Sequence, residues 1–172
     1  SAYIDFLATA RAAGLLGDSG RFLTEAWDAL PKNHRQTDED GRALRLAAGG
    51  GPFISEVDVA LLLQAKAAIG AGIETLLETA GIRADEISKL YLAGGFGMHL
   101  NVPHAIACGL LPGFKPEQVR VVGNTSLAGA LLALIDRNTL DEMESLRERV
   151  EVIELNLVGD FEDRYIDHLM LP

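Results

Sequence analysis

Residues 56–80 form a long, proline-free and largely apolar run, and any fold of this chain has to bury much of it. Ser55 stands just before this run, and the acid Asp58 follows it three positions later, a pattern typical of the first turn of a helix. Its apolar residues cover almost the whole circumference of a helix, which favours a buried central helix over a surface one. Small residues within it predict the close approach of a second element: Ala67, Ala68, Gly70, Ala71 and Gly72.

Shorter elements alternate along the rest of the chain. Helical patterns are predicted at residues 4–16, 101–109, 126–135 and 138–149, and residues 161–171 are predicted to form a short helix and a tail. Strand patterns are predicted at residues 42–48, 89–93, 119–122 and 150–155. Alternating strands and helices are typical of a layered α/β fold, and parallel strands require connections of about ten to twenty residues through a helix. The sequence therefore predicts an α/β domain with a largely parallel sheet.

The composition excludes several classes of protein and of site. The 172 residues suit one ordinary domain. The single cysteine, Cys108, rules out a disulfide within the chain and a cysteine-ligated iron–sulfur cluster, which takes about four thiolates. A formal charge of −10 disfavours nucleic acid and anionic membranes as partners. No uncharged apolar stretch of about 18 residues is present, and the first residues do not resemble a secretory signal, so the expected compartment is the cytoplasm.

Two corners that contain glycine follow predicted strands. Gly94-Gly95-Phe96-Gly97 comes after the strand at 89–93, and Gly123-Asn124 comes after the strand at 119–122. Ligands of parallel sheets bind beyond the carboxyl ends of the strands, and glycine lets a flat ring or a phosphate approach the backbone. The spacing is neither that of a dinucleotide-binding loop nor that of a P-loop. By pattern alone, a tight turn without a ligand is an equal alternative at residues 94–97, and helix capping is the favoured role of Asn124.

Three further side chains invite a functional interpretation. Lys66 is a lone cation within the apolar run, so it either extends to the surface, which we favour, or meets an anion. His104 and Cys108 are four residues apart on a predicted helix and could share a metal ion. Zinc takes about three or four ligands, so a buried apolar thiol is the favoured interpretation of Cys108.

Several longer motifs occur in a fixed order along the chain: residues 54–59, 63–73, 90–97, 105–112, 122–130 and 154–172. Among them are Leu90-Tyr91-Leu92-Ala93-Gly94-Gly95-Phe96-Gly97 and Val122-Gly123-Asn124-Thr125-Ser126-Leu127-Ala128-Gly129-Ala130. Together they resemble the C-terminal region of the ferredoxin-type reductive activators of corrinoid proteins. These activators belong to the superfamily of acetate and sugar kinases, heat-shock ATPases and actin. The resemblance spans about residues 4–172.

The resemblance implies a fold and a role. The fold is a ribonuclease H-like (actin-like ATPase) lobe, a mostly parallel sheet flanked by helices, in an incomplete C-terminal portion. Residues 1–172 would form this single lobe, without the ferredoxin domain and the first nucleotide lobe of a full-length relative. That relative uses ATP to return a cobalt(II) corrinoid on a methyl-carrier protein to cobalt(I). By resemblance, Gly94 and Gly95 contact the adenosine, with Phe96 and Gly97 next to them in the cofactor-binding loop. Asn124 lies in the neighbouring corner, near the nucleotide or where the lobes meet, and no residue is assigned to catalysis or to a metal.

Departures from the family pattern limit these expectations. The aspartate-glycine-threonine phosphate loop is absent, so ATP and Mg²⁺ are expected to bind this chain weakly or not at all. The iron–sulfur cluster would belong only to the missing ferredoxin domain, so the chain alone is expected to be inactive. Two alternatives stay open, namely a non-catalytic module for dimerisation and docking to the corrinoid protein, and a lobe of another sugar or acyl kinase-like ATPase.

Overall fold

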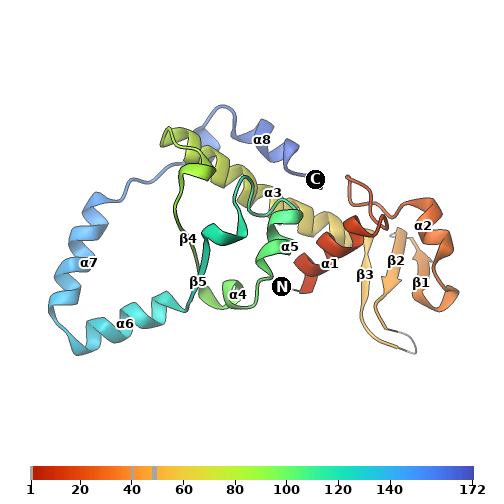
Figure 1. The fold of residues 1–172 in the computed structure, drawn as a ribbon, viewed down its shortest axis with the longest axis horizontal. Helices are drawn as coiled ribbons and strands as arrows, with labels where there is room; N and C mark the ends of the chain where they lie inside the picture. Colours follow the sequence, from red (N-terminus) through yellow and green to blue (C-terminus); the bar gives the residue numbers. More distant parts are fainter. Residues whose placement is uncertain (1, 40, 48–49) are drawn as a thin grey trace.

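The computed structural model describes residues 2–39, 41–47 and 50–172. Its α-helices are α1 (Ala2–Ala12), α2 (Thr24–Ala29), α3 (Glu56–Thr79), α4 (Gly94–Met98), α5 (Val102–Ala107), α6 (Thr125–Ile135), α7 (Asn138–Arg149) and α8 (Phe161–Asp167). Its strands are β1 (Arg35–Asp38), β2 (Gly41–Arg45), β3 (Phe53–Ser55), β4 (Leu90–Ala93) and β5 (Val119–Gly123). Short 3₁₀ turns occur at Lys32–His34, Ala84–Glu86, Pro116–Gln118 and Leu155–Leu157. Figure 1 shows α3 in the middle, with the three-stranded sheet at one end of the molecule and α6 and α7 at the other.

Helix α3 starts where its sequence predicts. The backbone N–H of Asp58 donates to Ser55 Oγ at 3.1 Å, and the backbone N–H of Ser55 donates to Asp58 Oδ2 at 2.9 Å. These hydrogen bonds satisfy N–H groups that the first helical turn leaves free. The pKa of the Asp58 carboxyl is lowered, because the backbone N–H and the hydroxyl of Ser55 both donate to Oδ2 and stabilise its charged form.

The burial of α3 is one-sided, which corrects the expectation of a helix buried all round. Val59, Leu63 and Ala67 are buried, whereas Leu61 and Leu76 on the other side of the helix are exposed. Among the described helices, α3 alone has the length and apolar composition to cross a membrane, a test that the core helix of a soluble protein also passes. The protein buries almost half of that stretch.

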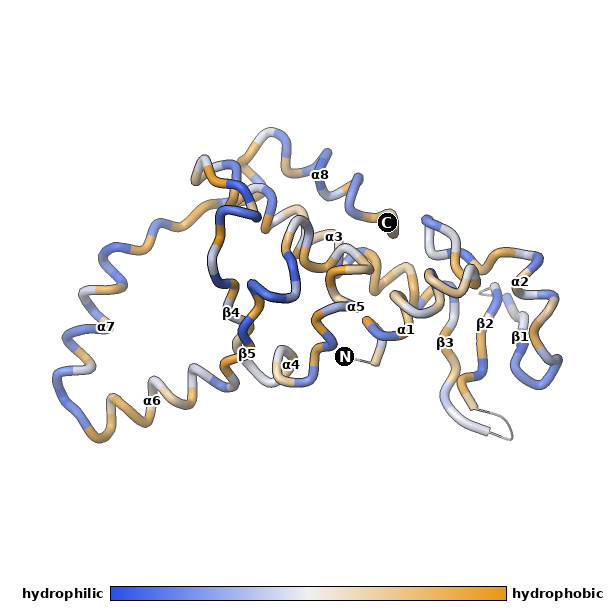
Figure 2. The backbone as a smooth tube through the Cα atoms, in the orientation of Figure 1, coloured by the Kyte–Doolittle hydropathy of each residue, from blue (hydrophilic) through white to orange (hydrophobic). Residues whose placement is uncertain are grey.

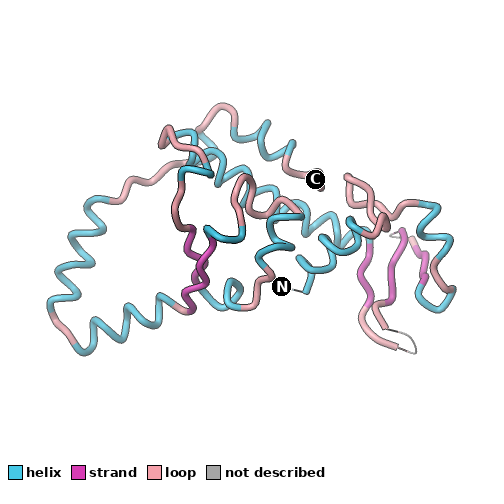
Figure 3. Tube along the Cα trace, viewed as in Figure 1, coloured by secondary structure: helices cyan, strands magenta, loops and turns pink. Residues whose placement is uncertain are grey.

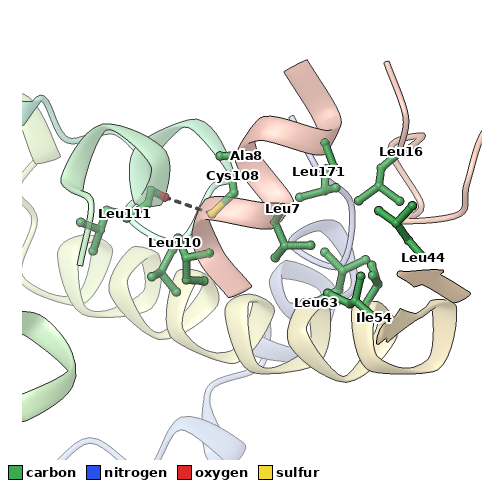
Figure 4. Packing of buried hydrophobic residues seen from close by; sticks show 14 of the residues in the cluster. Leu7, Ala8, Leu16, Leu44, Ile54, Leu63, Cys108, Leu110, Leu111 and Leu171 are labelled. Atoms are coloured by element: carbon green, nitrogen blue, oxygen red, sulfur yellow. Dashed lines mark hydrogen bonds between the residues drawn. The ribbon is translucent and has the colours of Figure 1, made fainter. Parts of the chain in front are cut away.

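Most buried residues gather where α1, α3, α5 and the C-terminal tail meet (Figure 4). Leu7 comes from α1, Leu63 from α3 and Leu171 from the tail, and all three are buried. Cys108, just after α5, is also fully buried, and its thiol donates to the carbonyl of Ala105 at 3.5 Å. Burial raises the pKa of this thiol, as expected for a cysteine in an apolar core.

The strands form two separate groups (Figure 3). Strands β1, β2 and β3 are antiparallel, with Leu44 opposite both Arg35 and Ile54. Strands β4 and β5 are parallel, with Leu90 opposite Val119, and their connection runs through α4 and α5. Parallel pairing is therefore confined to β4 and β5 among the described strands. The expected largely parallel sheet is corrected here, because short connections such as the one between β1 and β2 permit only antiparallel pairing.

The predicted strand at residues 150–155 is wrong. Residues 150–154 are irregular, and a 3₁₀ turn follows at Leu155–Leu157. The alternation of apolar and acidic residues there does suit a strand, but a strand also needs a neighbour with which to pair. In the described part of the chain, no strand lies beside this segment.

Candidate functional site

The parallel pairing of β4 and β5 brings the two predicted glycine corners together. Ala93 is the register partner of Gly123, with a shift in register between Leu92 and Ala93. Gly94 and Gly123 both have left-handed backbone angles, with φ of 87° and 74°. Because L side chains disfavour these angles, glycine suits each corner. The two glycine corners, which were predicted separately, therefore meet at the carboxyl ends of β4 and β5.

Residues 94–98 form a short helix, α4, where the sequence suggested a loop. A side-chain carbon added at Gly94 or at Gly95 would meet no atom within 4 Å, so the space above both residues is open. Phe96 is 59% exposed. Gly97 differs, since it is buried and a side-chain carbon there would lie 3.4 Å from Cβ of Leu92. Gly94, Gly95 and Phe96 thus present an open surface, and Gly97 has a packing role.

Asn124 adopts the capping role favoured by its sequence context. Its Oδ1 accepts a hydrogen bond from the backbone N–H of Leu127 at 3.0 Å and so caps α6. The side chain is nevertheless exposed beside the corner at Gly123. A side-chain carbon at Gly123 would lie 3.8 Å from the sulfur of Met98, which places the end of α4 against this corner.

We refer to Gly94, Gly95, Phe96, Gly123 and Asn124 as the glycine shelf. None of these residues has a side chain that titrates near neutral pH. The glycine shelf can therefore hold a ligand by contact and by backbone hydrogen bonds, but it supplies no acid or base. Over residues 2–39, 41–47 and 50–172, no three His, Cys, Asp or Glu side chains gather as a metal site.

His104 and Cys108 do not face a common site. Nδ1 of His104 lies 2.5 Å from Oδ1 of Asp5, so His104 joins α5 to α1. Cys108 is in the core, as described above. Each side chain thus has a structural explanation of its own.

The structure corrects both interpretations of Lys66, namely extension to the surface and pairing with an anion. The residue is only 2% exposed, so it does not extend to the surface. Its ammonium donates to the backbone carbonyl of Met170 at 2.7 Å, so its partner is a neutral acceptor and not an anion. Desolvation lowers the pKa of Lys66. No local signal could have identified this partner, which lies 104 residues further along the chain.

The chain resembles known proteins over its whole length. A family model described as the C-terminal domain of RACo, the ASKHA domain, matches residues 1–172. The corrinoid activation enzyme RamQ of Eubacterium limosum is 31% identical over 179 aligned positions, which cover 99% of this chain and 30% of the enzyme. A Methanosarcina barkeri enzyme, the [Co(II) methylated amine-specific corrinoid protein] reductase, is 30% identical over 62% of this chain and 19% of its own length.

A solved structure extends the likeness to three dimensions. The reductive activator for corrinoid, iron–sulfur protein matches 98% of this chain with a TM-score of 0.87 and 33% identity, over 27% of its own chain. This chain therefore spans less than a third of the length of these relatives. Both the resemblance and the α/β fold class expected from the sequence are confirmed, and the chain belongs to the family of RACo C-terminal ASKHA domains.

Proposed function

We propose that this chain is the nucleotide-side C-terminal lobe of an ATP-dependent reductive activator, which returns cobalt(II) corrinoid on a methyl-carrier protein to cobalt(I). The names of the relatives support the corrinoid part, because they describe corrinoid activation, a Co(II) corrinoid protein reductase and a reductive activator. In this proposal, the ferredoxin domain and the first nucleotide lobe belong to the remainder of the activator. The partner is a corrinoid methyl-carrier protein.

The observation that carries the ATP part is the open space at the glycine shelf. A purine ring is flat, and it can lie against a backbone only where no side chain stands in the way. Gly94 and Gly95 leave that space free, and the exposed ring of Phe96 borders it. The residues present therefore fit a purine, and in this proposal the exposed amide of Asn124 orients the base from the neighbouring corner.

The same residues do not suffice for the phosphates or for a redox group. The glycine shelf carries no charged side chain, so the triphosphate and its Mg²⁺ need groups from elsewhere in the activator. One cysteine cannot hold an iron–sulfur cluster, so the electron must come from another domain. ATP, when bound, supplies free energy that changes how tightly the activator binds the corrinoid protein. The part of this lobe is to hold and orient the base.

The substitution Gly95→Val in the full-length activator tests the proposal. A branched side chain fills the open space, so we expect the dissociation constant for ATP to rise at least about tenfold, or about 1.4 kcal/mol. Isothermal titration calorimetry measures the affinity, and the rate of cobalt(I) formation is expected to fall in parallel. Circular dichroism is expected to show an unchanged fold, because nothing lies within 4 Å of the added carbon.

Gly159→Val is the matched control, since Gly159 is also free of neighbours within 4 Å but comes just before α8, which lies far from α4 (Figure 1). Unchanged ATP affinity in Gly95→Val would refute the assignment of the shelf. ATP titrated into residues 1–172 alone is expected to bind weakly or not at all, because phosphate and Mg²⁺ contacts usually supply most of the affinity.

A further inference from the structure

Helix α6 exposes an apolar surface to solvent, which is energetically unfavourable. Eight of its eleven residues are Ala, Leu or Ile, yet none of the eleven is buried. In Figure 2, the helix is predominantly hydrophobic and extends away from the body of the molecule. Leu127, Leu131 and Leu134 follow each other at helical spacing and are all exposed, Leu134 by 84%. We call these three residues the α6 stripe.

The α6 stripe is not the surface that α6 uses to contact α7. Gly129 and Ala133 are the half-buried residues on α6, and a side-chain carbon at Gly129 would lie 3.3 Å from Met143 of α7. On a helix with 3.6 residues per turn, these two positions lie opposite Leu127 and Leu131. The α6 stripe therefore faces away from α7 and has no partner among the described residues.

Strands β4 and β5, which lead into α6, are also uncovered. Tyr91 and Val122 are exposed, and each strand has only one neighbour among the described strands. Parallel sheets in proteins are normally covered on both faces, and two strands alone are too few for a stable sheet. Beside β4, an apolar groove of about 270 Å³ is lined by residues that include Leu76, Ile87 and Tyr91. Tyr91, an exposed residue of β4, is also part of this groove.

The solved relative indicates what covers this surface. It matches 98% of this chain with a TM-score of 0.87, so the match includes the segments that form α6 and α7. In the described chain, few contacts join these two helices to the body, and elements with few buried contacts open easily unless another segment covers them. This chain corresponds to only 27% of that protein, so a long stretch of the same polypeptide is available to provide it.

We propose that the α6 stripe and the uncovered side of β4 and β5 form the seat for the remainder of the same activator polypeptide. The occupant presents an apolar surface to Leu127, Leu131 and Leu134. The inference rests on the proposed function in one respect, namely that residues 1–172 are part of a longer activator. It does not depend on where ATP binds or on what the activator reduces.

Hydrogen exchange of the full-length activator, measured by mass spectrometry, tests the seat. We expect the amides of α6 to exchange at least about tenfold more slowly than those of α7, because only α6 is covered. The variant Leu131→Glu is expected to abolish this difference and to lower the unfolding temperature, since it places a charge in a buried contact. Leu61→Glu is the matched control, because Leu61 is 59% exposed and Leu131 is 56% exposed, but Leu61 lies on α3.

Three outcomes would overturn the inference. Exchange in α6 as fast as in α7 would show that the stripe is free in the whole protein. Protection that disappears on dilution would assign the surface to a second copy of the chain. Protection that needs added corrinoid protein would assign it to that partner. Because none of these readouts uses ATP or cobalt reduction, the seat can fail while the proposed function stands, and the reverse also holds.

Discussion

A single buried ammonium joins the central helix to the end of the chain. Lys66 Nζ donates to the carbonyl of Met170, which lies 104 residues further along the chain. An ammonium group in such a place is costly without a partner, so the hydrogen bond to Met170 offsets part of the desolvation. Because burial favours the neutral form, the pKa of Lys66 lies below its ordinary value of 10.5.

The variant Lys66→Met is expected to be less stable at pH 7. The substitution leaves the Met170 carbonyl unpaired, which costs about 1–3 kcal/mol, but removes the buried charge, so we expect the lower end of that range. Between the lowered folded pKa and 10.5, the unfolded chain binds more protons than the folded one. The wild-type free energy of unfolding therefore rises with pH in this window, and the deficit of the variant grows.

Urea unfolding at several pH values between 7 and 10 measures both effects. Lys89→Met changes an exposed lysine and is the control, for which we expect a difference that does not depend on pH. A deficit of Lys66→Met that stays constant over the whole range would contradict the depressed pKa of Lys66.

At the scale of elements, the contact between α3 and α8 depends on a glycine. A side-chain carbon at Gly70 would lie 2.7 Å from Nδ1 of His168, just after α8. Nε2 of His168 lies 3.1 Å from Oε2 of Glu74, and Nη1 of Arg164 donates to Oγ1 of Thr75 at 3.1 Å. The small-residue patch predicted from the sequence thus admits α8, and polar side chains hold it in place.

Gly70→Ala and Gly72→Ala are expected to change stability in opposite directions. At Gly70 the added carbon clashes with the His168 ring, and overpacking of this kind costs about 1–3 kcal/mol. At Gly72 the added carbon would lie 3.6 Å from Leu155, which is an ordinary contact. Alanine also favours the helical backbone, so we expect this variant to be more stable by about 0.5–1 kcal/mol. Urea unfolding of the two variants checks the difference. Equal stability would mean that α8 does not lie closely against α3.

At the scale of the whole molecule, the C-terminal tail connects segments that are distant in sequence. Leu171 is buried, and its backbone N–H donates to the carbonyl of Asp18 at 2.7 Å. Nε of Arg11, on α1, donates to the carbonyl of Pro172 at 2.9 Å. Together with the bond from Lys66 to Met170, these contacts join α1 and α3 through the tail. The body is therefore expected to unfold as a unit that includes its last residues.

Leu171→Ala is expected to destabilise the chain by about 2–5 kcal/mol, because it removes a buried side chain from the core. Met170→Ala is the matched control at the neighbouring position, because Met170 accepts its hydrogen bond through the backbone and its side chain is exposed. We therefore expect this variant to lose no more than about 0.5 kcal/mol of stability. Thermal or urea unfolding compares them. If the two variants were equally stable, the tail would not belong to the core.

The sequence alone determined the features that depend on neighbouring residues. Ser55 and Asp58 start α3, and Asn124 caps α6, because a cap and its N–H partner are only three residues apart. Glycine after a strand predicted the corners at Gly94 and Gly123, and the order of motifs indicated the family. The roles of Gly94, Gly95, Phe96, Gly97 and Asn124 toward a nucleotide stay predictions.

Only the tertiary structure decided what depends on residues far away in sequence. It assigned Lys66 to Met170, left residues 150–154 without strand structure and paired β1, β2 and β3 antiparallel. It also left α6 exposed, although its composition suits a buried helix. The physical reason is that an apolar or charged side chain specifies a kind of environment, while the element that provides this environment is chosen by the packing of the whole chain.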